Sequence, residues 1–132
     1  MILGIGVDMV QIPRIEGVWR RHGPRFVARI LTPLEQQQWR GKTEGAALRF
    51  LATRFAAKEA CVKALGTGFS QGISFQDIEI TNQASGAPVL SLRGKAEAVL
   101  TTKAPLGKTQ LHLSLSDDAP GVVAFVVISL TD

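Results

Sequence analysis

Residues 55–68 read Phe55-Ala-Ala-Lys-Glu-Ala-Cys-Val-Lys-Ala-Leu-Gly-Thr-Gly68. With about 100° of rotation per residue, one apolar stripe contains Leu48, Leu51, Phe55 and Val62, which predicts that this face of a helix packs into a core. We predict that the helix spans about residues 46–65 and stops at the glycine turn of the quoted stretch, because glycine commonly follows a helix end. A long buried helix therefore dominates the predicted fold.

Glu59 lies inside this apolar stripe. Burying a lone carboxylate costs on the order of several kcal/mol, so Glu59 must shift its pKa, pair with a cation or bind a metal. Lys63 follows one turn later and precedes the turn Gly66-Thr67-Gly68, and together these features predict a site for a phosphorylated ligand and its metal. Two alternatives stay open: a surface pair between Glu59 and Lys63, worth roughly a few tenths of a kcal/mol, and a simple helix cap at the glycine turn.

The first ten residues predict a β-strand with one face made mostly of glycine. Gly4 and Gly6 share this face with Asp8, while apolar side chains occupy the other face. A glycine face has no side-chain cover, so we expect another part of the molecule to lie against the strand near Asp8. The long helix carries small residues along one flank, where a backbone or a ligand can approach closely: Ala52, Ala56 and Ala60.

The other predicted elements complete an α+β fold in a single domain, residues 1–132, with an antiparallel sheet packed against the long helix. They are a helix at 13–22 that Gly23-Pro24 ends, a helix at about 32–41 with Thr32 as its N-cap, strands at 77–81 and 89–92, a helix at 95–103, and strands at 111–116 and 122–130. The last strand is apolar on both faces, which predicts either a central place in the sheet or burial at a subunit interface.

Composition places the chain among ordinary globular proteins, since 45% of its residues are hydrophobic and 20% are charged. No apolar run approaches the roughly 20 residues needed to cross a membrane, and the N-terminus has no cationic segment typical of a signal peptide. Cys61 is the single cysteine, which excludes an internal disulfide and fits a reducing compartment. We therefore expect a cytoplasmic protein without a membrane partner, in which Cys61 is structural.

Positive charge is concentrated in one part of the chain. Residues 14–63 contain eleven lysines and arginines against four acidic residues, whereas the rest of the chain has a net charge of −3. This asymmetry predicts an anionic partner. A nucleic-acid-binding module is the main alternative to an enzyme, but the chain has no tyrosine and few aromatic residues among its basic ones. We therefore expect no nucleic-acid partner.

Several motifs together resemble the bacterial holo-acyl-carrier-protein synthases, the small single-domain type of 4′-phosphopantetheinyl transferase. They are Gly4-Ile-Gly-Val-Asp8, Arg29-Ile-Leu-Thr32, Arg54-Phe-Ala-Ala-Lys-Glu59, Lys63-Ala-Leu-Gly-Thr-Gly68, Ser74-Phe-Gln-Asp-Ile-Glu79, Gly86-Ala-Pro88 and His112-Leu-Ser-Leu-Ser116. The resemblance implies a magnesium enzyme that moves the phosphopantetheine arm of coenzyme A onto a serine of apo-acyl carrier protein for fatty acid biosynthesis. The other product would be adenosine 3′,5′-bisphosphate, and the implied assembly is a homotrimer with its sites between subunits.

The resemblance also implies roles for individual residues. Asp8 and Glu59 match the family's metal ligands and, with Lys63 on the pyrophosphate, would form the catalytic group. The residues that match the region lining coenzyme A are Arg54, Lys63, Gly66, Thr67 and Gly68. The substrate carrier is a small acidic helical protein in this family, and the matching docking residues are Arg14, Arg25 and Arg29, with Phe26 as an apolar anchor.

The implied chemistry suits these residue types. Phosphoryl-type transfer needs positioning and neutralisation of phosphate charge, and Mg²⁺ commonly uses only one or two carboxylates plus substrate phosphates. Either Glu59 or a metal-bound water could take the serine proton, and the sequence does not choose between them. Asp117 stands where many family members have histidine close to the coenzyme phosphates, so an imidazole role does not carry over. An inactive structural subunit is a third possibility, which intact Asp8, Glu59 and Lys63 argue against.

Overall fold

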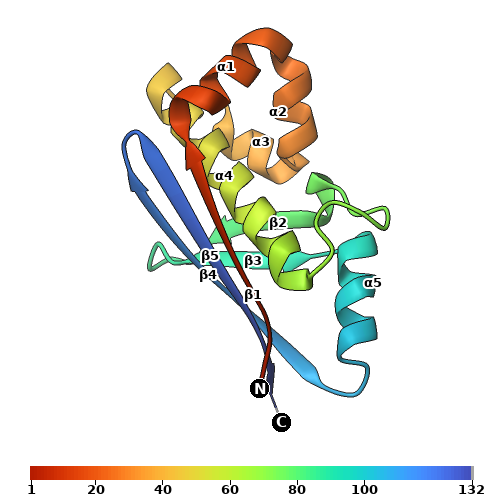
Figure 1. Cartoon of the computed structure of the whole chain (residues 1–132). Coiled ribbons are helices and arrows are strands. Elements are labelled where there is room, and N and C mark those ends of the chain that lie inside the picture. Colours follow the sequence, from red (N-terminus) through yellow and green to blue (C-terminus); the bar gives the residue numbers. More distant parts are fainter. Residues whose placement is uncertain (132) are drawn as a thin grey trace.

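A computed structural model describes residues 1–131 and contains one three-stranded antiparallel sheet. Strand β1 (Ile2–Gln11) pairs with β5 (Gly121–Thr131), which in turn pairs with β4 (Lys108–Asp118). The sheet runs along the long helix α4 (Glu44–Leu65), as Figure 1 shows. The prediction that the last strand is central is confirmed, because β5 lies between the other two strands.

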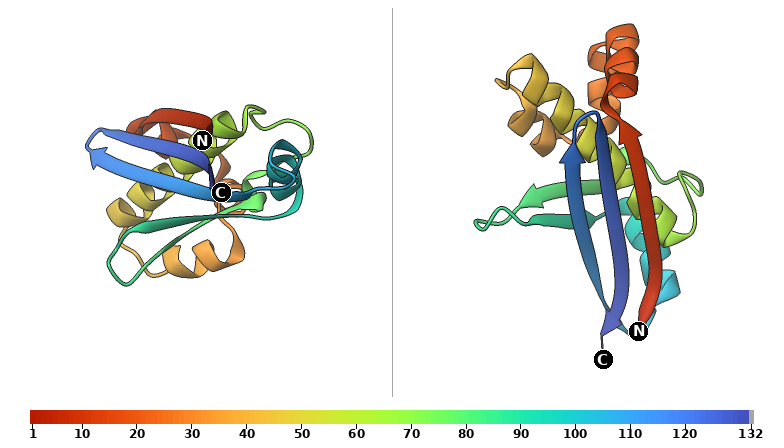
Figure 2. Two further views of the ribbon diagram at one scale, coloured as in Figure 1. Left: turned by 90° about the horizontal axis from the view of Figure 1, so that it is seen from below. Right: turned by 60° about the vertical axis from the view of Figure 1, so that its left-hand side comes forward.

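The remaining elements surround α4 on its other sides. Three short helices gather at its N-terminal half, α1 (Ile12–His22), α2 (Pro24–Ile30) and α3 (Pro33–Trp39). The 3₁₀ turn η1 (Phe75–Asp77) leads into a separate antiparallel hairpin, β2 (Ile78–Asn82) and β3 (Pro88–Leu92), which helix α5 (Gly94–Lys103) follows. The hairpin is not hydrogen-bonded to the long sheet, although β3 lies beside β4 (Figure 2), so the α+β prediction is confirmed with two sheets instead of one.

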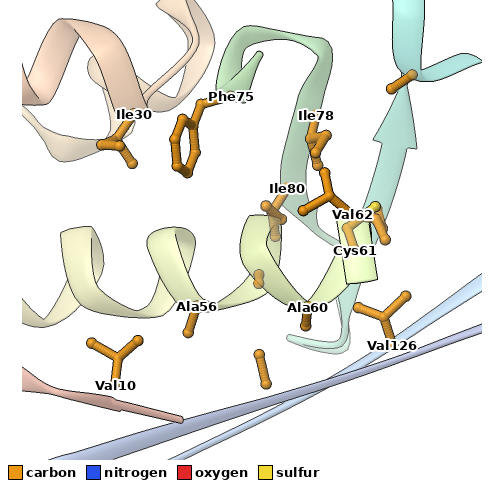
Figure 3. Close-up of a cluster of buried hydrophobic side chains, with 14 of the residues drawn as sticks. Val10, Ile30, Ala56, Ala60, Cys61, Val62, Phe75, Ile78, Ile80 and Val126 are labelled. Atoms are coloured by element: carbon orange, nitrogen blue, oxygen red, sulfur yellow. The ribbon is translucent and has the colours of Figure 1, made fainter. Parts of the chain in front are cut away.

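Helix α4 is buried on more than the one stripe that its sequence predicts. Ala56 and Ala60 face Val10 and Val126 of the sheet, and the hairpin side of the helix is equally covered (Figure 3). Side chains on that opposite side come from α2, η1 and β2: Ile30, Phe75, Ile78 and Ile80. The helix therefore forms the centre of the core, and the predicted stripe covers only part of its buried surface.

Sequence patterns predicted most helix ends but missed one helix. Gly23 ends α1 as predicted, yet Pro24 then starts α2, because proline is well tolerated at a first helical position. Thr32 caps α3 as predicted: its hydroxyl accepts a hydrogen bond from the Glu35 amide, and the Glu35 carboxylate accepts one from the Thr32 amide. The last turn of α2 and the first of α3 are thus joined by a well-defined corner.

The outer face of the sheet, turned away from α4, is apolar and exposed. Its exposed large side chains are Ile5, Val7, Met9, Val123 and Phe125. Strand β5 is therefore apolar on both faces for two reasons. Its inner face packs into the core, and its outer face belongs to an exposed apolar surface. Among residues 1–131, every helix is too short or too polar to cross a bilayer.

Candidate active site

Glycine in β1 lets the backbone of α4 approach the strand very closely. A Cβ atom on Gly4 would overlap the carbonyl oxygen of Ala64, and one on Gly6 would overlap the carbonyl oxygen of Ala60. The expectation that something lies against the glycine face of β1 is confirmed, and the helix itself is what lies there. This contact brings Asp8, two residues further along β1, next to the last turns of α4.

Asp8 and Lys63 form an ion pair across this contact. Lys63 Nζ lies 3.0 Å from Asp8 Oδ1 and 3.0 Å from the carbonyl oxygen of Val7, and donates a hydrogen bond to each. Asp8 is largely buried, and its second oxygen, Oδ2, has no hydrogen-bond partner within residues 1–131. The alternative of a surface ion pair between Glu59 and Lys63 is therefore excluded for this structure, since the ammonium of Lys63 turns to Asp8.

Glu59 shares this site. Partial burial raises the pKa of Glu59, the nearby charge of Asp8 raises it further, and Lys63 and Arg14 act in the opposite direction. Two neighbouring carboxylates, one of which raises the pKa of the other, form a site that favours a cation. The pair fits Mg²⁺, which prefers oxygen ligands and often takes only one or two carboxylates from the protein. Within residues 1–131 no cluster of three or more His, Cys, Asp or Glu could hold a metal, so water and substrate phosphates would complete the shell.

A cavity of about 410 Å³ opens beside Glu59. Three of the predicted docking residues, Arg25, Phe26 and Arg29, line it together with Glu59. Phe26 is buried and packs toward Phe55, with their ring centroids 6.5 Å apart. Phe26 thus lies in the wall of the cavity, and its role as an apolar anchor for the carrier protein stays a prediction. Arg14 does not line the cavity, although its charge acts on Glu59.

Arg54 does not belong to the same region as Lys63. Its guanidinium lies 4.1 Å from the centroid of the Phe50 ring, and its Nη2 donates a hydrogen bond to Asn82 Oδ1 at 3.2 Å. Burial lowers the pKa of Arg54, and within residues 1–131 its Nε has no hydrogen-bond partner. The predicted coenzyme-binding residues are therefore split between two parts of the chain.

A second cavity of about 410 Å³ adjoins Arg54. Its charged and amide-bearing lining residues are Lys42, Arg49, Arg54, Asn82 and Asp117. Asp117 Oδ2 lies 3.9 Å from Arg49 Nε, so this acid turns toward an arginine of the same cavity. Three cations against one acid make this cavity suitable for an anion.

The glycine turn after α4 is a helix cap. Gly66 has the left-handed φ of 83°, and its amide donates to the carbonyl oxygen of Lys63 at 3.0 Å. The amides of Thr67 and Gly68 both donate to the carbonyl oxygen of Val62 at 3.2 Å. All three amides are thus used by the helix, so the predicted phosphate cradle does not form from these donors. Coenzyme binding by Gly66, Thr67 and Gly68 stays a prediction.

A buried ion pair that the sequence motifs did not predict lies beside this site. Lys58 Nζ lies 2.6 Å from Glu35 Oε1, and both side chains are fully buried. Burial lowers the pKa of Lys58, and the charge of Glu35 opposes that effect. The helical wheel contained the signal, because it places Lys58 as close as Glu59 to the centre of the apolar stripe. Cys61 is fully buried too, which raises the pKa of its thiol to about 12 and agrees with a structural role.

A family model described as the 4′-phosphopantetheinyl transferase superfamily matches residues 4–116. The chain belongs to this superfamily. It is 49% identical to a holo-[acyl-carrier-protein] synthase of Mesorhizobium japonicum, over 97% of this chain and 93% of that relative. The fold and the family that the sequence motifs resemble are thus confirmed.

Two solved structures are similar over nearly the whole chain. The holo-[acyl-carrier-protein] synthase of Neisseria meningitidis has 38% identity and a TM-score of 0.85, with 98% of this chain and 99% of that chain covered. A synthase of Bacillus anthracis, solved in complex with CoA (3′,5′-ADP), has 36% identity and a TM-score of 0.82, with 100% and 99% covered. Membership of a transferase superfamily favours the enzyme over the nucleic-acid-binding alternative.

Proposed function

We propose that the chain is a holo-acyl-carrier-protein synthase, which transfers 4′-phosphopantetheine from coenzyme A to a serine of apo-acyl carrier protein and releases adenosine 3′,5′-bisphosphate. The observation that carries this proposal is the group formed by Asp8, Glu59 and Lys63 next to a basic cavity, in a chain similar over its length to such synthases. We place the reaction in the cytoplasm, where the product serves fatty acid biosynthesis.

The three side chains have complementary roles in the proposed reaction. The ammonium of Lys63, held by Asp8 at 3.0 Å and half exposed, can meet the pyrophosphate of coenzyme A. Glu59 has a raised pKa, which makes it a stronger base than an ordinary glutamate, and it faces the cavity that would receive the carrier serine. Asp8 and Glu59 would hold Mg²⁺, which neutralises charge on the phosphate oxygens when it is bound.

The second cavity is proposed to take the phosphorylated adenosine end of coenzyme A. The guanidinium of Arg54 lines it, and Lys42 and Arg49 add positive charge. Lys63 is not among the residues that line the cavity of Arg54. A complete site would therefore form where this cavity of one subunit meets Lys63 of the next, which supports a homotrimer.

The outer face of the sheet supplies a surface for such an assembly. Val7 and Phe125 pair across β1 and β5 and remain exposed in the single chain. Contiguous exposed apolar surface commonly marks an interface. Phe125→Lys should yield monomers in light scattering and lose transfer activity, because each site would lose half of its lining. Leu106→Lys is the control, because Leu106 is fully exposed but lies in the turn before β4. A monomeric wild-type protein would contradict the assembly.

The proposed function is tested by the intact mass of an apo-acyl carrier protein after incubation with this protein, coenzyme A and Mg²⁺. The expected result is a gain of one phosphopantetheine, absent when the acceptor serine of the carrier is alanine or when EDTA is added. Activity that persists in EDTA would remove Mg²⁺ from the proposal. No mass gain with several carrier proteins would overturn the proposed function.

A further inference from the structure

The ammonium of Lys58 is fully hydrogen-bonded inside the protein. Its Nζ lies 2.6 Å from Glu35 Oε1, 2.6 Å from the carbonyl oxygen of Ile30 and 3.1 Å from the carbonyl oxygen of Phe75. An ammonium has three N–H donors, and each one has an acceptor here. Lys58 therefore links α4 at once to the last residue of α2, to the first turn of α3 and to η1.

Glu35 extends this link to the hairpin. Its Oε1 accepts a hydrogen bond from the Thr32 amide at 2.9 Å, and its Oε2 accepts one from the Ile80 amide of β2 at 2.8 Å. Gln76 of η1 adds two bonds, from its Nε2 to the carbonyl oxygens of Ala28 and Leu31, each at 2.7 Å. The corner between α2 and α3 is thus fixed to η1, β2 and α4 by polar contacts.

This network lies directly behind the cavity beside Glu59. Glu59 follows Lys58 in the chain, and the side chains of Ile30 and Phe75, whose carbonyl groups Lys58 holds, line the cavity. Arg25 and Arg29 line it from α2. A buried ion pair is a weak means of stabilising a fold, because apolar side chains of similar volume often serve as well. Apolar side chains cannot, however, reproduce the directional hydrogen bonds that the pair makes to the neighbouring elements.

We propose that Lys58 and Glu35 are positioning residues that set the shape of the carrier-protein cavity relative to Glu59. The pair holds the carboxyl end of α2 and η1 at fixed places beside α4, so that Arg25 and Arg29 present their charges at a defined distance from the reacting carboxylate. This inference rests on the proposed function and adds to it two residues that contact neither substrate.

The test is the double variant Lys58→Met/Glu35→Met, which removes both charges of the pair together, so that neither partner is left buried without the other. Ile128→Ala is the control, because Ile128 is buried on β5 and does not line the cavity. Both variants are assayed well below their melting temperatures. We expect the double variant to raise the KM for carrier protein at least tenfold over the control, with the KM for coenzyme A within twofold of it. A carrier KM equal to that of the control would overturn the proposal.

Hydrogen exchange gives a second readout that does not depend on activity. In the double variant, amides of residues 24–31 and 75–77 should exchange faster than in the Ile128→Ala control, because α2 and η1 lose their polar attachment to α4. Equal exchange in the two variants would overturn the proposal. A wild-type protein that fails to modify any carrier would count against the proposed function alone, and the exchange measurement would then decide the positioning role.

Discussion

Lys63 Nζ donates a hydrogen bond to Asp8 Oδ1 over 3.0 Å, which joins the last turns of α4 to the middle of β1. Glu59 lies one turn earlier on the helix and forms no ion pair within the described residues 1–131. Lys63 is therefore committed to one of the two carboxylates, Asp8. The negative charge of Glu59 is therefore only partly compensated, and its ionisation should affect the stability of the folded protein.

Replacing Glu59 with glutamine should stabilise the protein in EDTA by an amount that depends on pH. Burial and the charge of Asp8 raise the folded-state pKa of Glu59 above its ordinary value of 4.5. As pH rises through 4.5, the unfolded chain loses this proton first, so wild-type stability falls until pH passes the folded-state pKa. In urea unfolding from pH 4 to 8, Glu59→Gln should gain on the wild type within that window and keep a constant advantage above it. A glutamine variant that is less stable at pH 7 would make Glu59 a structural ion-pair partner.

Replacing Lys63 with methionine should abolish transfer while changing the melting temperature only slightly. The ammonium is half exposed, so its contribution to stability is small, whereas the proposed contact with the pyrophosphate depends on its charge. Lys108→Met is the matched control, because Lys108 is exposed at the start of β4 and lines neither of the two cavities. Turnover should fall at least a hundredfold in the first variant and stay near the wild-type value in the second. Wild-type turnover in Lys63→Met would remove this residue from the site.

Gly6→Ala should damage both the fold and the site, because the new methyl group would overlap the carbonyl oxygen of Ala60. Overpacking against a backbone atom cannot relax by a side-chain rotation, so we expect a loss of about 3 kcal/mol or more in the free energy of unfolding. Gly17→Ala is the control: it lies in α1 with open space around it and should stabilise the protein by about 0.5–1 kcal/mol. Equal stabilities in chemical denaturation would show that α4 can move away from β1 at little cost.

Reversing two charges of the cavity, Arg25→Glu/Arg29→Glu, should raise the KM for carrier protein at least tenfold at low salt and leave the KM for coenzyme A unchanged. The effect should shrink as salt is added, because charge complementarity acts mainly on association and is screened. Arg20→Glu/Arg21→Glu changes the net charge equally, but Arg20 pairs with Glu16 and neither residue lines the cavity. Similar KM values in the two double variants would show that Arg25 and Arg29 act only through the general positive charge of the protein.

Asp117→His should bind coenzyme A more tightly than the wild type. Asp117 lies 3.9 Å from Arg49 in the cavity proposed for the coenzyme phosphates, so its charge opposes an anion there. Both partners are substantially exposed, and we expect a gain of only a few fold in Kd by calorimetry. Asp118→Asn is the control for charge alone, since Asp118 does not line the cavity. Loss of transfer in Asp117→His would show that this acid has a positive role of its own.

The sequence by itself determined the α+β class, the long helix, the capped start of α3 and the two unusual carboxylates. These features depend on local periodicity, on cap residues and on side-chain chemistry, all of which a single segment carries. The sequence did not predict helix α2, because its seven residues follow a glycine-proline break and form too short a pattern to be distinguished from a loop.

Only the tertiary structure decided which charges meet. Lys63 binds Asp8, 55 residues away in the chain, and Lys58 binds Glu35, 23 residues away, although a neighbouring acid, Glu59, was available to each lysine. Likewise, no sequence motif predicts that Arg54 lies away from Lys63. Ion pairs depend on which elements pack together, and here that packing depends on Gly4 and Gly6, which admit the backbone of α4 where any larger residue would exclude it.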